Sequence, residues 1–183
     1  MEMIPVVMVR PDLKDIPQVP LAADYRIRPF RRGDRATWVR IHELAEPFHT
    51  VTSRTFNDSF GDDLPAMKKR GFFLVAPDGQ DVGTITAWYD RAYARRRWGR
   101  IHWVAIVPEH RGKRLSKSMM TVAMNRMRAL GHRRGMLTTQ ITRIPAIKTY
   151  LDFGFVPDMT ADRAKEGWTL VRRALPHPTL RNL

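Results

Sequence analysis

A group of basic side chains follows an apolar run in the middle of the chain. Residues 101–107 are largely β-branched or aromatic, as a buried strand requires, and Pro108 cannot continue a strand. An apolar stripe at helical spacing begins at Leu115. A strand that turns directly into a helix presents free backbone N–H groups at the positive end of the helix dipole, which is an anion site. The cations that would reinforce it are Arg111, Lys113, Arg114 and Lys117.

The alternative for this loop is an ordinary strand-to-helix turn with a solvated basic face, and the loop alone does not separate the two. The formal net charge of +14 fits an anionic partner such as cofactor phosphates, an acidic acceptor or nucleic acid. Arg greatly outnumbers Lys, so we attribute most of this charge to coding composition and a local share to the loop at Arg111. The charge is spread along the chain with no dense tail, which argues against nucleic acid as the partner.

Length and composition indicate one globular domain. The 183 residues, 43% hydrophobic and 27% charged, suit one α/β domain with a proper core. We expect a domain over 22–176, an extended N-terminal segment over 1–21 and a C-terminal tail over 177–183. The chain has no Cys, its His residues lack ligand spacing, and it has no apolar run of membrane-spanning length. We therefore expect a cytoplasmic protein without disulfides, a bound metal or a membrane partner.

The elements around the loop follow from periodicity and from breakers. Four prolines should keep 1–21 mostly irregular, with 6–9 as a strand on a sheet edge. The tail from Pro176 should be frayed. Further strands are expected at 25–30, 71–76, 82–88, 99–107, 135–140, 155–156 and 168–174. Helices are expected at 35–46, 115–130 and 145–153, with one or two short ones between 49 and 70.

The loop sequence VPEHRGKRLS resembles the acyl-CoA-binding motif of the GCN5-related N-acetyltransferases, the GNAT superfamily. That motif reads Arg or Gln, two residues, Gly, one residue, then Gly or Ala. Arg111 occupies the first position. Arg114 stands where the family has Gly, and Ser116 stands where it has Gly or Ala.

A second segment, RIPAIKTYLDFGFVP, strengthens the resemblance. It is similar to the GNAT motif in which Asn, two residues and Ala open a helix, followed by Tyr and then Gly-Phe. Arg143 replaces the usual Asn. The resemblance covers about residues 24–175. The matching positions are Ala146, Ile147, Tyr150, Gly154 and Phe155.

The resemblance implies an α/β (α+β) fold built on a mixed, mostly antiparallel sheet with helices on both faces. The sheet is splayed between its fourth and fifth strands, here 99–107 and 135–140. Acetyl-CoA would bind in that cleft as cosubstrate, with its pantetheine along the fourth strand and its pyrophosphate on the loop amides. The guanidinium of Arg114 can bind a phosphate where Gly is replaced. The cofactor-binding residues so implied are Val104, Ala105, Ile106, Arg111, Gly112, Lys113, Arg114, Leu115, Ser116 and Arg143.

Acetyl transfer from a thioester to an amine needs a neutral amine, a stabilised carbonyl oxygen and a proton for the leaving thiolate. Tyr150 matches the family tyrosine that protonates the CoA sulfur, and its alternative role is packing of the ring at a helix interface. Backbone amides near Ala105 and Ile106 would stabilise the oxyanion.

The sequence gives less evidence for the identity of the general base. Many relatives place a carboxylate on the fifth strand, where this chain has Thr138 and Thr139. His102 is the leading candidate because arylalkylamine acetyltransferases carry His at a similar place and imidazole titrates in the useful range. Its alternative is a structural strand histidine. Weaker candidates on acceptor-side elements are Glu46, His49 and Asp90.

The sequence therefore predicts an acetyl-CoA-dependent N-acetyltransferase acting on a primary amine of a small molecule or protein. The loops at 46–65 and 89–98 would set the acceptor, which the sequence does not identify. A homodimer is compatible with the sequence. The alternative function is a non-catalytic basic module of the same fold attached to RNA or a ribonucleoprotein, since Arg114, Ser116 and Arg143 depart from the motifs.

Overall fold

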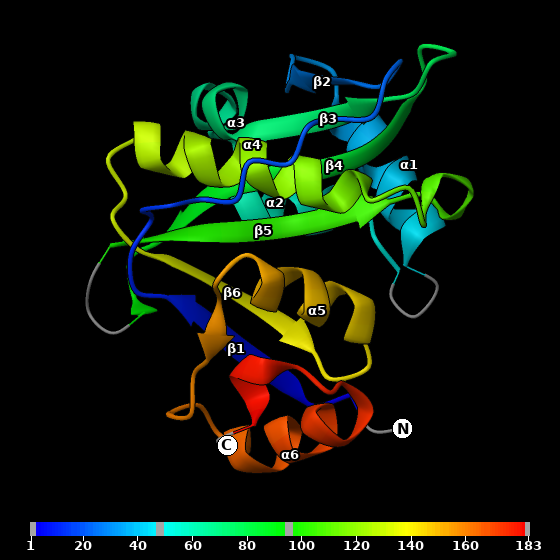
Figure 1. Ribbon diagram of the computed structural model, residues 1–183. Coiled ribbons are helices and arrows are strands. Elements are labelled where there is room, and N and C mark those ends of the chain that lie inside the picture. The colour runs from blue at the N-terminus through cyan, green and yellow to red at the C-terminus, as the bar shows by residue number, and fades with distance from the viewer. Residues whose placement is uncertain (1–2, 47–49, 94–96, 182–183) are drawn as a thin grey trace.

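The computed structural model describes residues 3–46, 50–93 and 97–181. Within these ranges seven strands form one mixed, mostly antiparallel sheet in the order β2-β3-β4-β5-β6-β1-β7 (Figure 1). Helix α4 lies in front of β3 to β5 and α1 behind them, so helices cover both faces (Figure 1). The fold class expected from the sequence is confirmed.

The strands are β1 Pro5–Arg10, β2 Arg26–Pro29, β3 Gly71–Val75, β4 Asp81–Asp90, β5 Trp98–Ile106, β6 Gly135–Gln140 and β7 Val156–Pro157. The helices are α1 Arg35–Ala45, α2 Ser53–Phe60, α3 Leu64–Arg70, α4 Leu115–Ala129, α5 Ile144–Asp152 and α6 Ala164–Ala174. Single 3₁₀ turns occur at η2 Pro108–His110 and η3 Pro178–Leu180.

The sheet opens between β5 and β6, as expected. These parallel strands pair only at Gly99 with Gly135 and at Arg100 with Met136, and then diverge. A Cβ on Gly99 would lie 2.7 Å from the sulfur of Met127, so only glycine fits at this closed end without displacing its neighbours. Beyond it, the β6-facing edge of β5 has no strand partner among the described residues.

A β-bulge lies in β5 where the strand leaves its neighbour. Thr84 pairs with Ala105 and Thr86 with His102, so β5 carries one residue more than β4 over this interval. Trp103 in the bulge has φ +50°, and its Nε1 donates to Ser59 Oγ of α2 at 2.8 Å. Bulges bend a strand and redirect its side chains, which here happens beside the sheet opening.

Helix α1 packs its apolar stripe against the sheet as expected. Trp38, Ile41 and His42 are buried. Asp34 is the N-cap residue, but its carboxylate makes no capping bond; it accepts from Arg28 Nη1 at 2.7 Å. Asp is a favoured N-cap residue, but here the ion pair with Arg28 takes the place of a side-chain cap.

The expected strand at 168–174 is wrong, because these residues belong to α6. Its buried residues recur at helical spacing and pack on β1, whereas a strand would bury alternate residues. A Cβ on Gly167 would lie 2.8 Å from Val6 Cγ1, so glycine allows α6 to approach the sheet closely. The stripe consists of Ala164, Trp168, Val171 and Leu175.

The N-terminal strand was expected on a sheet edge, and this placement is wrong. β1 lies between β6 and β7, antiparallel to both, with Val6 opposite Thr139 and Val9 opposite Val156. Interior pairing on both sides is possible because the strand's prolines lie at or beyond its ends. β1 is thus an integral part of the half-sheet that carries β6.

The segments that follow β1 and α6 are anchored to the rest of the fold. The segment after β1 runs along α4, where Ser118 Oγ donates to Pro20 O at 2.7 Å and Val19 N donates to Thr121 Oγ1 at 3.1 Å. The tail was expected to fray from Pro176, but Leu180 is fully buried in the core. Burial of this one apolar side chain orders the tail through the described residues.

Candidate active site

The turn between β5 and α4 presents unpaired backbone N–H groups. The amides of residues 112–116 donate no hydrogen bond to any residue in the described ranges. Gly112 has φ +78° and Arg114 φ +60°, both left-handed. Successive N–H groups in such a turn form an anion-binding concavity at the helix N-terminus.

Arg114 occupies the left-handed N-cap position of α4. The left-handed conformation costs an L-residue about 1–2 kcal/mol and costs glycine almost nothing. This backbone geometry explains why Gly suits the position, and it shows that Arg114 keeps the same turn with some strain. The side chain is exposed and lies beside the free amides.

The Arg111 side chain connects two elements through hydrogen bonds and is not a free cation. Its Nε donates to Ile106 O at 2.9 Å and its Nη2 donates to Ala45 O at 2.7 Å. The side chain therefore ties the end of β5 to the end of α1. This contact was not expected, because the sequence indicated only a cation that reinforces the anion site.

The other cations of the turn also have partners. Lys113 Nζ donates to the Tyr25 hydroxyl at 3.2 Å, and this hydroxyl is 2.8 Å from His110 Nδ1. Lys117 Nζ donates to Asp152 Oδ2 of α5 at 2.8 Å. These contacts position positive charge around the turn.

The residues expected to line the cofactor form the last part of β5 and the first turn of α4. Val104 to Ile106 follow the bulge and lie on the strand edge that β6 leaves unpaired. A Cβ on Gly83 of β4 would lie 2.9 Å from Ala105 O, so β4 approaches this backbone closely. Leu115 is buried under the turn, while Ser116 is half-buried.

Tyr150 lies on the buried face of α5. Its ring is nine-tenths buried, and its hydroxyl has no hydrogen-bond partner within the described residues. Burial raises the pKa of the phenol to about 12, although the positive charge of Arg143 acts in the opposite direction. The phenol is therefore protonated at neutral pH.

His102 lies on β5 immediately before the bulge. Its ring packs 5.6 Å from that of Phe60 and 5.9 Å from that of Trp103, measured between centroids. Burial, with smaller effects of Arg100 and His42, lowers the pKa of His102 to about 3. The imidazole is neutral at pH 7 and has a free lone pair.

A second histidine in this region, His42, lies on the buried face of α1. His42 is 3% exposed, and its Nε2 has no partner among the described residues. Its ring centroid is 4.2 Å from that of Trp38 and 5.0 Å from that of Trp103. Burial, followed by the charge of Arg143, lowers its pKa to about 3.

Arg143 forms an ion pair with Glu46. Glu46 is the C-cap of α1 and Arg143 the N-cap of α5, so the pair joins elements from either side of the sheet opening. The charge of Arg143 also acts on His42 and Tyr150. One guanidinium thus acts on a carboxylate and an imidazole at the end of α1 and on a phenol of α5.

The remaining candidates lie elsewhere. His49 is outside the described residues. Asp90 ends β4 and accepts from the Ala92 and Tyr93 amides at 2.9 and 2.8 Å, which is a turn role. Thr138 and Thr139 lie in β6 opposite β1. Among the described residues no group of three His, Asp or Glu side chains has metal-binding geometry.

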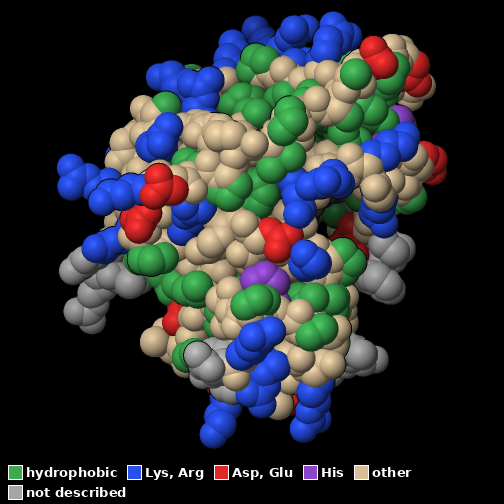
Figure 2. Space-filling model, in the orientation of Figure 1, with side chains coloured by type: hydrophobic (Ala, Val, Ile, Leu, Met, Phe, Trp, Pro, Cys, Tyr) green, Lys and Arg blue, Asp and Glu red, His purple; other side chains and the backbone are tan. Residues whose placement is uncertain are grey.

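A cluster of arginines surrounds one tyrosine where β4 ends. The guanidinium carbons of Arg70, Arg91 and Arg97 lie 4.8, 5.2 and 5.5 Å from the ring centroid of Tyr89. Arg70 is buried and donates to Ala87 O at 3.0 Å. Figure 2 shows Lys and Arg side chains gathered along the upper and left edges of this face.

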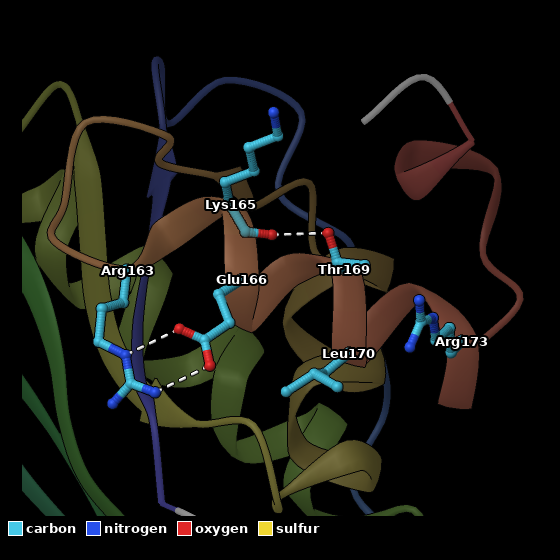
Figure 3. A pocket seen from close by; sticks show the side chains of 6 residues that line it. All are labelled: Arg163, Lys165, Glu166, Thr169, Leu170 and Arg173. Carbon is cyan, nitrogen blue, oxygen red and sulfur yellow. Dashed lines mark hydrogen bonds and ion pairs between the residues drawn. The ribbon is translucent and has the colours of Figure 1, made fainter.

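A surface pocket of about 500 Å³ lies on the outer face of α6, and it contains none of the expected site residues. Figure 3 shows Arg163 and Glu166 bonded to each other at its rim. Its lining is Arg163, Lys165, Glu166, Thr169, Leu170 and Arg173. Over the described ranges no helix is both long and apolar enough to cross a bilayer.

Curated proteins with similar sequences include mycothiol acetyltransferases. A mycothiol acetyltransferase of Streptomyces bingchenggensis is 29% identical over 150 residues, covering 79% of this chain and 47% of that protein. One from Streptomyces coelicolor is 26% identical, covering 80% and 47%. The chain spans about half the length of the curated relatives it matches.

The solved structures agree in fold. A GCN5-related N-acetyltransferase from Sphaerobacter thermophilus superimposes with a TM-score of 0.69 at 18% identity, covering 84% of this chain and 48% of that one. A GNAT-family acetyltransferase from Colwellia psychrerythraea gives 0.63 at 9% identity, covering 86% and 54%. The sequence model of the acetyltransferase (GNAT) family matches residues 38–155, which is more than half of the chain, and the chain therefore belongs to the GNAT family.

Proposed function

We propose that this chain is an acetyl-CoA-dependent N-acetyltransferase that transfers the acetyl group to a primary amine. The observation that carries the proposal is unpaired backbone in two stretches, the β6-facing edge of β5 and the free amides of 112–116, which the hydrogen-bonded turn at 107–111 connects. An unpaired strand edge offers hydrogen bonds to the amides of a pantetheine arm, and the free N–H groups suit a pyrophosphate. The residues present therefore fit acetyl-CoA.

Specific residues would hold the cosubstrate. Val104 and Ala105 offer backbone groups to the pantetheine, and amides near Ala105 and Ile106 would stabilise the oxyanion. Arg114 offers its guanidinium to a phosphate beside the turn. Bound acetyl-CoA supplies the activated acetyl group, and the chain supplies its orientation.

Tyr150 is the proposed acid. A phenol with a pKa of about 12 is fully protonated at neutral pH and has a hydroxyl free to donate. It can therefore give a hydrogen bond and then a proton to the sulfur as the carbon–sulfur bond breaks. Burial, which raises the pKa, is also what excludes water from the donor.

His102 is the proposed proton acceptor on the amine side. Its pKa of about 3 keeps the imidazole neutral at pH 7, so its lone pair can accept a hydrogen bond from the attacking amine. The same low pKa means that it holds a proton only briefly and passes it on to water. His102 thus orients the amine more than it stores a proton.

The proposal is tested first by binding and then by turnover. Calorimetry should detect CoA and acetyl-CoA binding to the purified protein, and absence of both would overturn it. An acceptor screen with acetyl-CoA, read out as released thiol, then identifies the amine. Because similar proteins are named mycothiol acetyltransferases, the amine acceptor implied by that name belongs in the screen.

A second function, binding of RNA, is favoured by one observation. Arg70, Arg91 and Arg97 converge on the Tyr89 ring, and none forms an ion pair with a carboxylate within the described residues. Basic groups interleaved with an aromatic ring suit a phosphate backbone and a stacked base. A mobility shift of single-stranded RNA that weakens with salt and is lost in Arg91→Ala/Arg97→Ala would support it, and unchanged migration would exclude it.

A further inference from the structure

We propose that the last turn of α1 is the acceptor subsite and that the acceptor is a zwitterion, an amine with a carboxylate close to it. Glu46 would take the ammonium and Arg143 the carboxylate of the incoming molecule. The inference rests on the proposed function, because it names the acceptor class of the same site.

The ion pair between Arg143 and Glu46 is accessible and can be replaced by contacts of the two side chains with a ligand. The Arg143 side chain is 44% exposed and that of Glu46 16% exposed, so solvent and ligand reach the pair. Ion pairs of this exposure add little to stability, and replacing one is correspondingly inexpensive. A molecule that carries both an ammonium and a carboxylate gives each side chain a new partner of the right sign.

An amine without a carboxylate would not give both Glu46 and Arg143 a new partner. If its ammonium displaced Arg143 from Glu46, the guanidinium would lose its carboxylate. A carboxylate on the ligand replaces it, and arginine binds carboxylates in a bidentate geometry. The ion pair therefore selects against amines that lack a nearby anionic group.

The ion pair between Arg143 and Glu46 is connected to the residues proposed for acetyl transfer. The charge of Arg143 acts on Tyr150, the proposed acid, and on His42. Arg111, which holds the end of α1 through Ala45 O, comes from the turn with the free amides. The pair is thus linked to the proposed acid through the charge of Arg143 and to the turn with the free amides through Arg111.

An independent observation also points to a ligand here. His42 Nε2 is buried and has no partner among the described residues, although buried polar atoms are normally satisfied. His42 and Glu46 are neighbours at the end of α1, where the Glu46 amide donates to His42 O at 2.9 Å. A polar ligand bound at this end of α1 would supply the missing hydrogen bond.

The test uses three acceptors that differ in one group: phenylalanine, phenylalaninamide and phenethylamine, with acetyl-CoA as donor. The full set of natural α-amino acids extends the zwitterion arm. We expect kcat/KM for the preferred amino acid to exceed that for its amide at least 10-fold. Arg143→Gln should collapse this ratio to near one, because the amide never used the guanidinium.

Glu46→Gln should raise KM for every amine about 10-fold and leave the dissociation constant of CoA unchanged. Glu43→Gln, on the exposed face of the same helix, is the matched control and should change neither. If CoA does not bind the wild-type protein, the proposed function itself fails. If CoA binds but the amino acid and amide react equally, or if Glu46→Gln leaves KM unchanged, only the acceptor subsite is overturned.

The proposal can still be tested if the activity screen detects no acetylation of any amine. Calorimetry on the CoA-saturated protein should then detect amino-acid binding, with loss of that binding in Glu46→Gln. If no zwitterion binds or reacts with the CoA-loaded protein, the acceptor class is wrong.

Discussion

The ammonium of Lys117 lies 2.8 Å from the carboxylate of Asp152, joining the first turn of α4 to the last turn of α5. Lys148 and His177 approach the same carboxylate at 3.0 and 3.4 Å. Because β5 and β6 diverge, this cluster joins the two half-sheets through side chains where backbone pairing has stopped. These side-chain contacts thus connect α4 and α5 beside the opening.

Asp152→Asn should destabilise the protein at neutral pH but not in acid. Burial alone would raise the pKa of Asp152, but hydrogen bonds from Lys117 and Lys148 outweigh burial and lower it to about 2. A carboxyl with a depressed pKa contributes stability above its unfolded pKa of about 3.9 and loses it as pH falls toward 2. Urea unfolding should show a deficit of about 1–2 kcal/mol at pH 7 that vanishes near pH 2. Asp58→Asn, at an exposed ion pair, is the control, and an equal deficit at both pH values would refute the pairing.

Three histidines, of which His42 and His132 are buried and His102 is half-buried, should resist protonation and make the fold acid-sensitive. Burial is the main cause that lowers the pKa of His42 and His102 to about 3 and of His132 to about 4. The unfolded chain takes up these protons near pH 6.5, so stability present above that pH is lost as pH falls toward 4. Titration followed by NMR should show their ring signals unchanged from pH 8 to 5. Ring signals that titrate near pH 6.5 would contradict the burial.

Tyr150→Phe should lower kcat without weakening cosubstrate binding. The variant keeps the ring and its packing, and loses only the hydroxyl that would protonate the sulfur. General acid catalysis contributes about 10²–10⁴-fold, so a loss of at least 100-fold is expected. Tyr89→Phe, at the other end of the sheet opening, controls for loss of a phenol. Wild-type turnover in Tyr150→Phe would remove the acid role.

Arg114→Gly should stabilise the fold and Arg114→Ala should not. Glycine relieves the left-handed backbone at φ +60°, a gain of about 1 kcal/mol, whereas alanine retains the Cβ that causes the strain. Both variants lose the guanidinium, so calorimetry with CoA separates charge from backbone. Equal loss of affinity in both would assign a phosphate contact to the side chain. Equal melting temperatures would mean that the turn stores no strain.

Local patterns predicted most elements of this fold correctly. The apolar run before Pro108, the stripe from Leu115 and the Pro145 that opens α5 are signals that depend only on neighbouring residues. The prediction of a strand at 168–174 was wrong because it gave the β-branched and aromatic residue types more weight than the helical spacing of the apolar residues. Trp168 and Val171 are three residues apart and both are buried, which the alternation of a strand does not allow.

Contacts between residues that are far apart in the sequence could not be predicted from local patterns. The motif comparison marked Arg143 as a departure from Asn, but nothing near it in the sequence indicates its ion pair with Glu46. The same holds for Arg111, whose hydrogen bond to Ala45 O exists only once α1 and the turn are assembled. His42 could have been singled out as the one ionisable residue in an otherwise apolar helix stripe.

The interior place of β1 has a consequence for how the protein is made. Pro5 pairs with Gln140 and Arg10 with Gly135, so β1 is synthesised long before the strand that it pairs with. Contacts between such distant residues form slowly because a long loop must close. The nascent chain therefore exposes an apolar, strand-forming segment until β6 has been synthesised. This segment is where a chaperone would be expected to bind.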